Sequence, residues 1–305
     1  MTANAKTFAP VAAEAIISKG WFGAYKYLIL RRISQIVVLG LFLVGPWFGL
    51  WIVKGNLVSS LTLDTLPLTD PYVLLQTIAS RHWPELTAIV GALIVAGAYT
   101  TLGGRLYCSW VCPINPVTDA AHWLHMRLDL NKGWQPKRET RLYVLATTFV
   151  VSAITGTVAF EFVNPVSMLH RGLIFGMGFA WTFVVAVFLF DLFVARRGWC
   201  GHLCPVGAFY GLLNAPSLLR VSAVNRASCD DCMDCFAVCP EMHVITPALR
   251  GTGDDTPLIT ARDCTTCGRC IDVCSQNVFR FTHRFDERIG AGLKTDAGTE
   301  NRHVA

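Results

Sequence analysis

The chain has 305 residues, of which 53% are hydrophobic and only 15% are charged. Its mean hydropathy of +0.44 is too high for an ordinary soluble domain, so the composition indicates a membrane protein. The formal net charge of +5 comes from lysines and arginines that flank apolar stretches. It therefore gives no argument for nucleic-acid binding, and we expect no nucleic-acid partner.

Four apolar stretches are long enough to cross a hydrocarbon core of about 30 Å as helices. They lie at about residues 33–53, 86–104, 142–163 and 173–194. A further run at 203–219 is short and contains two prolines, which favours an interfacial or re-entrant segment. The pattern predicts an all-α four-helix transmembrane domain over residues 33–220, in contact with membrane lipid.

Lysines and arginines predict the orientation of these helices. Residues 1–32 contain five of them, and six more lie between the second and third stretches. Short segments rich in positive charge stay in the cytoplasm. With four spans, both termini are then cytoplasmic, and residues 1–32 form a cytoplasmic N-terminal segment.

The strongest motif is Cys229-x2-Cys232-x2-Cys235-x3-Cys239-Pro240, repeated as Cys264-x2-Cys267-x2-Cys270-x3-Cys274. In the bacterial ferredoxin run, three thiolates bind one [4Fe–4S] cluster and the fourth binds the other cluster. The expected ligand sets are Cys229, Cys232, Cys235 and Cys274 for the first cluster, and Cys264, Cys267, Cys270 and Cys239 for the second. Zinc is disfavoured because two such runs would crowd its thiolates, and disulfides are disfavoured by a cytoplasmic location.

These runs predict a small α+β domain of the bacterial 2[4Fe–4S] ferredoxin type over residues 221–283. Residues 284–305 are predicted to be a disordered tail. Two neighbouring clusters can accept and pass on single electrons, and they carry out no substrate chemistry of their own.

A second cysteine set is duplicated as Cys108-x3-Cys112-Pro113 and Cys200-x3-Cys204-Pro205. Each copy follows an apolar stretch, at the predicted cytoplasmic membrane face. A spacing of four places both thiols of a pair on one helical face, and the proline suits a chain that leaves a helix. Three interpretations stay open: an additional metal centre shared by four thiolates, with iron–sulfur favoured over zinc; two structural corners with small buried cysteines; or a reversible thiol switch.

Ionisable residues near the predicted spans are candidates for proton transfer, because burying them costs free energy that is usually tolerated for function. Glu161 lies near the outer end of the third stretch, and His170 precedes the fourth. Our hypothesis is that they accept the protons released when an electron donor dissolved in the membrane is oxidised. The alternative is that both side chains reach interfacial water.

The order of the cysteine motifs, together with Gly45-Pro-Trp-Phe-Gly49 and Leu66-Pro-Leu-Thr-Asp-Pro71, resembles the NapH-type family of ferredoxin-like membrane subunits. The likeness extends over about residues 20 to 282. It implies a multi-pass protein of the bacterial inner membrane that takes electrons from ubiquinol or menaquinol. It also implies a periplasmic four-cluster ferredoxin subunit and periplasmic nitrate reductase as partners. The Cys-x3-Cys-Pro elements alone occur more broadly, in regulators of nitrous oxide reduction and in copper-assembly proteins of cytochrome oxidase.

Two classes of function follow. The first is an electron-transfer subunit of a quinol dehydrogenase, and the second is a redox-sensing or maturation and assembly protein for a respiratory metalloenzyme. A metal-handling role for the duplicated cysteines is a third. The predicted topology poses a problem for the first class, since the ferredoxin runs lie inside and the acceptor outside.

Overall fold

The computed structural model describes residues 11–128, 136–176, 178–251 and 256–286. The chain divides into two compact units. One combines residues 1–31 with residues 217–305 and is called the ferredoxin-like unit here; the other, residues 32–216, is called the helical unit. The part of the predicted tail beyond residue 286 lies outside the described residues.

The helical unit contains eight of the described α-helices and one small sheet. The helices are α2 (Lys26–Phe48, which begins in the other unit), α3 (Pro71–Ala79), α4 (Leu86–Leu102), α5 (Ile114–Arg127), α6 (Thr140–Thr155), α7 (Pro165–Phe175), α8 (Ala180–Leu189) and α9 (Pro205–Leu213). Short π-helical turns occupy Tyr107–Val111, Phe190–Val194 and Trp199–Leu203, and a 3-10 turn occupies Ala159–Val163.

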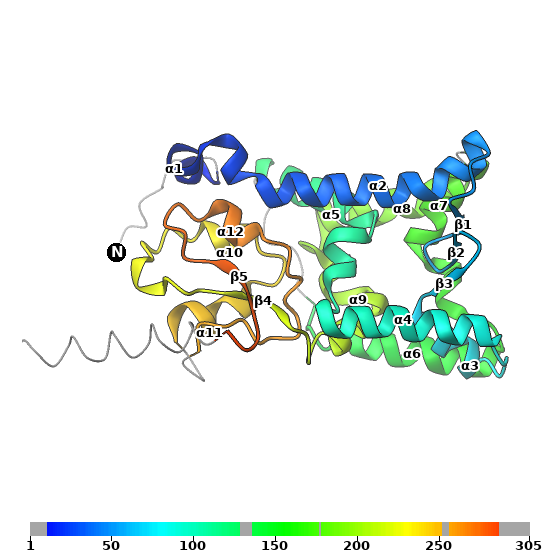
Figure 1. Ribbon diagram of the computed structural model, residues 1–305. Helices are drawn as coiled ribbons and strands as arrows, with labels where there is room; N and C mark the ends of the chain where they lie inside the picture. The colour runs from blue at the N-terminus through cyan, green and yellow to red at the C-terminus, as the bar shows by residue number, and fades with distance from the viewer. Residues whose placement is uncertain (1–10, 129–135, 177, 252–255, 287–305) are drawn as a thin grey trace, which may run out of the picture. The chain divides into compact units, whose positions relative to one another are not determined.

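Two groups of helices make up this unit (Figure 1). One group contains α5, α7 and α8, with a core that includes Ile114, Val166 and Val187. The other contains α3, α6 and α9, with a core that includes Tyr72 and Tyr210. The chain crosses between the groups several times, and two of these crossings run in opposite directions, from α4 to α5 and from α8 to α9 (Figure 1). Both crossings are made at a Cys-x3-Cys-Pro element.

The predicted spans are largely helical, and the α-helices in the last three are shorter than predicted. Among the described residues, the run Ala13–Phe48 is the one helix that is long and apolar enough to cross a membrane. The apolar helices Leu86–Leu102, Thr140–Thr155 and Trp181–Val194 are shorter. With 17 residues, α4 is about 25 Å long at 1.5 Å per residue, close to the thickness of a hydrocarbon core. Four membrane spans therefore stay a proposal.

Two of the predicted stretches are interrupted. The stretch 142–163 stops being α-helical at Thr155, because Gly156 adopts φ 67°, a left-handed conformation that ends helices. The stretch 173–194 is divided between α7 and α8. The first of these begins early because the Asn164 side chain accepts a hydrogen bond from the Val166 amide, and Pro165 takes the first helical position.

The all-α description of the helical unit is wrong in one place. Strands β1 (Val53–Gly55), β2 (Ser59–Thr62) and β3 (Leu66–Thr69) form an antiparallel meander in the order β1-β2-β3. The Asn56 side chain closes the first turn by accepting hydrogen bonds from the amides of Val58 and Ser59. Strands of three or four residues show too little alternation to be recognised from sequence.

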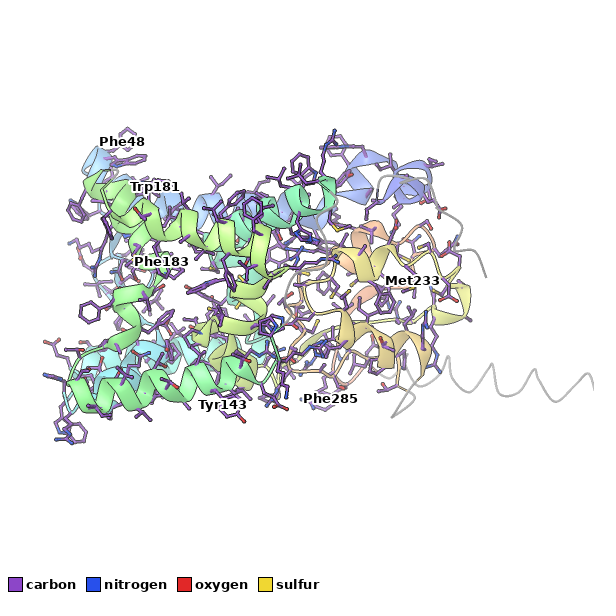
Figure 2. All side chains as sticks on the ribbon, turned by 180° about the vertical axis from the view of Figure 1, so that it is seen from behind. Phe48, Tyr143, Trp181, Phe183, Met233 and Phe285 are labelled. Atoms are coloured by element: carbon purple, nitrogen blue, oxygen red, sulfur yellow. The ribbon has the colours of Figure 1, made fainter. Side chains whose placement is uncertain are left out.

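Large apolar side chains cover the outer surface of the helical unit. Figure 2 shows Phe48 and Tyr143 pointing away from their helices, and these side chains are 73% and 70% exposed. Others on α2, α4 and α6 include Ile36, Leu93 and Ile154. So much exposed apolar surface on several elements indicates contact with an apolar environment, since the surfaces of soluble monomers expose only small apolar patches.

The ferredoxin-like unit contains short elements around the two cysteine runs. They are α1 (Ala13–Ala24), β4 (Leu219–Ser222), a 3-10 turn (Arg226–Ser228), α10 (Asp234–Val238), a second 3-10 turn (Met242–Val244), α11 (Ile245–Arg250), α12 (Arg269–Val273) and β5 (Arg280–His283). Strands β4 and β5 pair antiparallel, with Leu219 opposite His283. Helices α10 and α12 occupy equivalent places, each beginning after a left-handed residue, Met233 or Gly268, and ending before the fourth cysteine of its run.

The described part of the N-terminal segment packs into the ferredoxin-like unit. Ala12, Ala15 and Ala24 belong to the same hydrophobic core as Val221 and Ile245. The small alanine side chains let α1 approach this core closely. The sequence alone did not predict this packing, because alanines in a helix do not indicate which surface they contact.

Candidate metal centres

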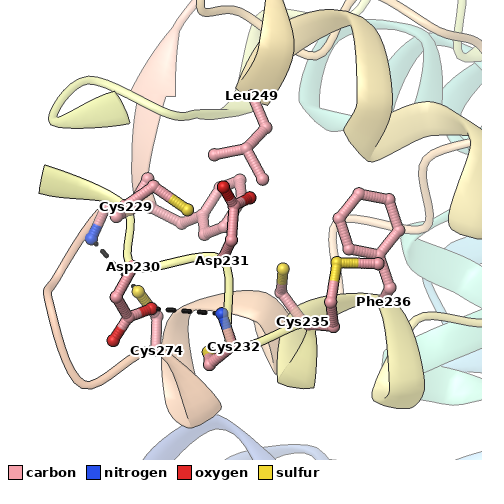
Figure 3. Close-up of a pocket in the computed structure, with 11 residues that line it drawn as sticks. Cys229, Asp230, Asp231, Cys232, Cys235, Phe236, Leu249 and Cys274 are labelled. Atoms are coloured by element: carbon pink, nitrogen blue, oxygen red, sulfur yellow. Dashed lines mark hydrogen bonds between the residues drawn. The ribbon is translucent and has the colours of Figure 1, made fainter. Parts of the chain in front are cut away.

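The eight cysteines of the ferredoxin runs line two cavities. Cys229, Cys232, Cys235 and Cys274 line one, and Cys239, Cys264, Cys267 and Cys270 line the other, each with an empty volume of about 350 Å³. Figure 3 shows the first group surrounding one space. In both cavities three cysteines come from one run and the fourth from the other run, which is the grouping the spacing predicts. The binding of clusters by these residues stays a prediction.

Backbone amides and apolar side chains shape the first of these cavities. The Val278 amide donates a hydrogen bond to the Cys274 sulfur over 3.3 Å, and the Cys232 amide donates to Asp230 Oδ1 over 3.3 Å (Figure 3). Phe236 and Phe279 lie in the lining. An amide directed at a sulfur stabilises its negative charge, which is one of the ways in which proteins set cluster potentials.

Arginines influence the second cavity. Burial, the largest single effect, raises the pKa of Cys267, but the positive charges of Arg269 and Arg31 hold it below its ordinary value. The thiolate is the form that binds metal. Arg31 belongs to the N-terminal segment, so that segment contributes charge to the cysteine site as well as packing to the core.

Each cavity offers four thiols, the number that a [4Fe–4S] cluster binds. Within the described parts of the chain, no group of three or more His, Cys, Asp or Glu side chains lies close enough together to hold one metal ion. Zinc needs its sulfur ligands within about 2.3 Å of a single point. In a [4Fe–4S] cube each cysteine binds a different iron, so the thiols surround a larger body. Four thiols that line one cavity match what a [4Fe–4S] cube requires.

A third cavity, in the helical unit, joins the duplicated cysteines. Cys108, Cys112, Cys200 and Cys204 all line it, and its empty volume is about 570 Å³. Cys112 packs against the cores of both helix groups. The two crossings of the chain thus bring the pairs to one place, as a shared four-thiolate centre requires.

The first cysteine of each pair lies in a π-helical turn and the second follows that turn directly, where the sequence suggested an ordinary helical face. The Cys112 amide donates to the Tyr107 carbonyl over 2.9 Å, and the Cys204 amide donates to the Trp199 carbonyl over 2.8 Å. Both second cysteines then have extended backbones, because a residue before proline is excluded from the helical region. Single π-helical turns inside helical segments are frequent at functional sites.

Helices α5 and α9 begin within two residues of the second cysteine of each pair. The amides of Ile114 and Asn115 hydrogen-bond Cys112, and those of Val206 and Gly207 hydrogen-bond Cys204. Burial is the larger effect and raises the pKa of Cys204 to about 12, whereas these amides lower it. Helix N-termini favour negative charge, so both helices are placed to stabilise thiolates once a metal compensates for their burial.

Glu161 and His170 lie near this region but do not line the cavity. Glu161 accepts a hydrogen bond from Asn164 Nδ2 over 3.1 Å and lies 3.7 Å from the Arg171 guanidinium. His170 is buried beside Phe42, with ring centroids 5.8 Å apart. Burial and, to a lesser degree, the charge of Arg171 lower the pKa of His170. Their role as proton acceptors stays a prediction.

Sequence reasoning missed Asp70 as a site residue. This buried carboxylate lines the cavity of the duplicated cysteines. Its Oδ1 accepts hydrogen bonds from the Tyr72 amide at 2.9 Å and from the Tyr210 hydroxyl at 3.2 Å. Burial raises the pKa of Asp70 to about 6. The signal available in the sequence was Leu66-Pro-Leu-Thr-Asp-Pro71, which marked the family resemblance but was given no role.

Comparison with known families agrees with this arrangement. Residues 85–131 and 175–222 match the family described as "4Fe-4S binding domain", and residues 228–286 match the "4Fe-4S dicluster domain". The first match contains both pairs of duplicated cysteines, and the second contains both ferredoxin runs. The chain is therefore an iron–sulfur protein of the ferredoxin type.

Several relatives are similar over most of the chain. Ferredoxin-type protein NapH of Escherichia coli is 50% identical over 89% of this chain and 94% of its own length. The methylamine utilization ferredoxin-type protein MauN of Methylorubrum extorquens is 51% identical over 90% of this chain and 96% of its own, and MauN of Paracoccus denitrificans is 53% identical over 89% and 95%. No solved structure matches. The predicted family is confirmed: the chain belongs to the NapH-type ferredoxin-like electron-transfer proteins, together with the closely similar MauN proteins.

Proposed function

We propose that this chain is the membrane electron-transfer subunit of a quinol dehydrogenase and that it holds three iron–sulfur centres. The observation that carries the proposal is the division of all twelve cysteines into three groups of four, each around its own cavity. Two groups correspond to the [4Fe–4S] clusters of a bacterial ferredoxin. The third, formed by the duplicated cysteines, is the additional centre.

The residues of the chain have separable tasks. Cysteine thiolates hold the clusters, which supply one-electron transfer when bound. Amides at the starts of α5 and α9 stabilise the sulfur charge at Cys112 and Cys204. Apolar side chains such as Phe236 and Phe279 exclude water from the ferredoxin-type site.

The membrane is the proposed source of electrons. The exposed apolar surfaces of α2, α4, α6 and α8 support a multi-pass protein of the bacterial inner membrane, with both termini in the cytoplasm. Quinol dissolves in that same apolar phase, and ubiquinol or menaquinol is the proposed donor. Glu161 and His170 remain the proposed proton acceptors. A quinol that diffuses between the membrane faces removes the need for one electron transfer across the whole bilayer.

The NapH relatives support a periplasmic four-cluster ferredoxin and periplasmic nitrate reductase as the electron-transfer partners. A second candidate has equal support from similarity, because the MauN relatives are 51% and 53% identical to the chain and are named for methylamine utilization. The same electron-transfer unit would then serve a different substrate pathway. Complementation separates the two candidates. If the gene for this chain restores nitrate reduction to a strain that lacks NapH, the first is favoured. If it restores only growth on methylamine, to a strain that lacks MauN, the second is favoured.

Metal analysis tests the three centres. Purified full-length protein should contain about twelve irons and as much sulfide, since each cube has four of each. The Cys108→Ser and Cys200→Ser variants should lose about four irons and one electron paramagnetic resonance (EPR) signal, while Cys229→Ser should affect a different signal. Eight irons that do not change in Cys108→Ser would exclude the third centre.

Stopped-flow spectroscopy tests the quinol reaction. Clusters of the protein in detergent or lipid should be reduced by quinol when the partner subunits are present. Reduction by dithionite but not by quinol, with the full partner set, would contradict a quinol dehydrogenase. It would favour the redox-sensing or assembly role instead.

A further inference from the structure

The duplication places an arginine three residues before the first cysteine of each pair. These are Arg105 before Cys108 and Arg197 before Cys200, and their side chains are 2% and 9% exposed. A guanidinium keeps its charge even when buried and is stabilised by nearby negative groups. Arg105 and Arg197 occupy equivalent positions of the repeat, so the groups around their two guanidinium ions can be compared directly. These groups differ.

Arg197 faces a carboxylate. Its Nη1 atom lies 3.2 Å from Asp119 Oδ1 on α5, and Asp119 also forms an ion pair with Arg32. Asp191, buried at the start of the preceding π-helical turn, is a second carboxylate that interacts with Arg197. The charge of this arginine is thus matched by carboxylates.

Arg105 is held between the two cysteine pairs. The preceding residue, Gly104, lies so close to α9 that a Cβ atom there would be 2.0 Å from the Tyr210 carbonyl oxygen. This contact brings the end of α4 against the helix that follows Cys204. The Arg105 side chain lies beside Gly207 and Cys204. A Cβ atom built on Gly207 would be 3.8 Å from Nη2 of Arg105 and 3.9 Å from the Cβ of Cys204.

The same arginine also acts on the other pair. Its backbone carbonyl accepts a hydrogen bond from the Cys108 amide over 3.1 Å. Its side chain interacts with Cys108 through charge and a hydrogen bond, and with Cys204 through charge. One buried cation therefore lies next to a thiol of each pair.

We infer that Arg105 sets the reduction potential of the centre held by Cys108, Cys112, Cys200 and Cys204. The inference rests on the proposed iron–sulfur centre at these cysteines. Uptake of one electron makes a thiolate-bound cluster more negative by one unit, and no bond is formed or broken. A fixed positive charge in a low-dielectric site stabilises the more negative state, so Arg105 raises the potential and makes the centre easier to reduce.

The test is a redox titration of the full-length protein in detergent, followed by EPR. Arg105→Gln should lower the potential of the signal that Cys108→Ser abolishes, making reduction at least tenfold less favourable, which corresponds to about 59 mV for one electron. The signals of the two ferredoxin-type clusters should not move. Arg105→Lys, which keeps the charge, should restore most of the potential.

Arg197→Gln is the matched control. It removes the same residue type from the equivalent repeat position, but one whose charge is matched by Asp119, so it should shift the potential much less. Equal shifts in both Gln variants, or an unchanged potential in Arg105→Gln, would overturn the inference.

Loss of the centre has a defined meaning too. If Arg105→Gln loses it and Arg105→Lys keeps it, the potential of Arg105→Lys decides: the inference holds if this potential stays near that of the unmodified protein and fails if it falls by about 59 mV or more. If both lose it while the other clusters remain, Arg105 is a structural residue and the inference fails. Absence of any third signal in the unmodified protein is a different result, since it contradicts the proposed function instead.

Discussion

The carboxylate of Asp272 connects the second cysteine run to the N-terminal helices. It lies on α12 between Cys270 and Cys274, and its oxygens accept hydrogen bonds from the amides of Tyr27 at 3.1 Å and Leu28 at 2.9 Å. These amides lie in the first turn of α2, where a helix cannot satisfy its own N–H groups. Asp272 thus acts as the cap of α2, supplied by a residue about 245 positions away in the sequence.

The size of this contribution follows from the two bonds. A hydrogen bond to a charged group contributes about 1.5 to 3 kcal/mol, and loss of an N-terminal cap costs about 0.5 to 2 kcal/mol. Burial raises the pKa of Asp272, while the Tyr27 and Leu28 amides lower it. The free-energy gain from the two hydrogen bonds is therefore partly offset by the cost of desolvating the carboxylate. We therefore expect Asp272→Ala to reduce the local stability of the start of α2 by about 2 kcal/mol.

Hydrogen exchange of the cluster-loaded protein, measured by mass spectrometry, checks this value. A loss of about 2 kcal/mol should speed exchange of the Tyr27 and Leu28 amides about 30-fold. Asp234→Ala is the control, because Asp234 accepts its hydrogen bond from the Ala12 amide at the start of α1. Exchange at Tyr27 and Leu28 that stays within about twofold of the unmodified protein, or that rises equally in both variants, would refute the capping role.

Three more predictions concern the helical unit. Since burial raises the pKa of Asp70 from 3.8 to about 6, the folded state binds this proton more tightly than the unfolded state, and stability should fall by about 3 kcal/mol as pH rises from about 4 to about 6. In chemical unfolding between about pH 4 and about pH 6, Asp70→Asn should lose part of that dependence, and equal slopes in the two proteins would contradict the prediction. Gly104→Ala should destabilise the protein by about 3 kcal/mol and lower its thermal midpoint, because the added Cβ would meet backbone atoms at α9 and its C-terminal end. Gly97→Ala on α4 is the control: nothing lies within 4 Å of its Cβ, so it should not lower the thermal midpoint. Glu161→Gln and His170→Ala should each slow cluster reduction by quinol about tenfold or more without changing iron content, and unchanged rates in both would exclude them as proton acceptors.

Local spacing in the sequence was enough to predict the ferredoxin runs and how their cysteines group. Three thiols within seven residues are held near one another by the chain itself, and the fourth follows one short helix later. Apolar stretches likewise predicted where most of the long helices lie. Their ends were less predictable, because Gly156 and the Asn164 cap stop or start helices inside continuous apolar sequence.

Only the tertiary structure decided which distant residues meet. Cys108 and Cys200 are brought to one cavity by two opposite chain crossings, and Asp70 reaches that cavity from a loop that follows a small sheet. The different surroundings of Arg105 and Arg197 could not be read from a repeat in which both occupy the same position. Such contacts depend on the packing of helices far apart in sequence. The sequence by itself determined the metal ligands that lie close together in the chain, and the packing decided the charges around them.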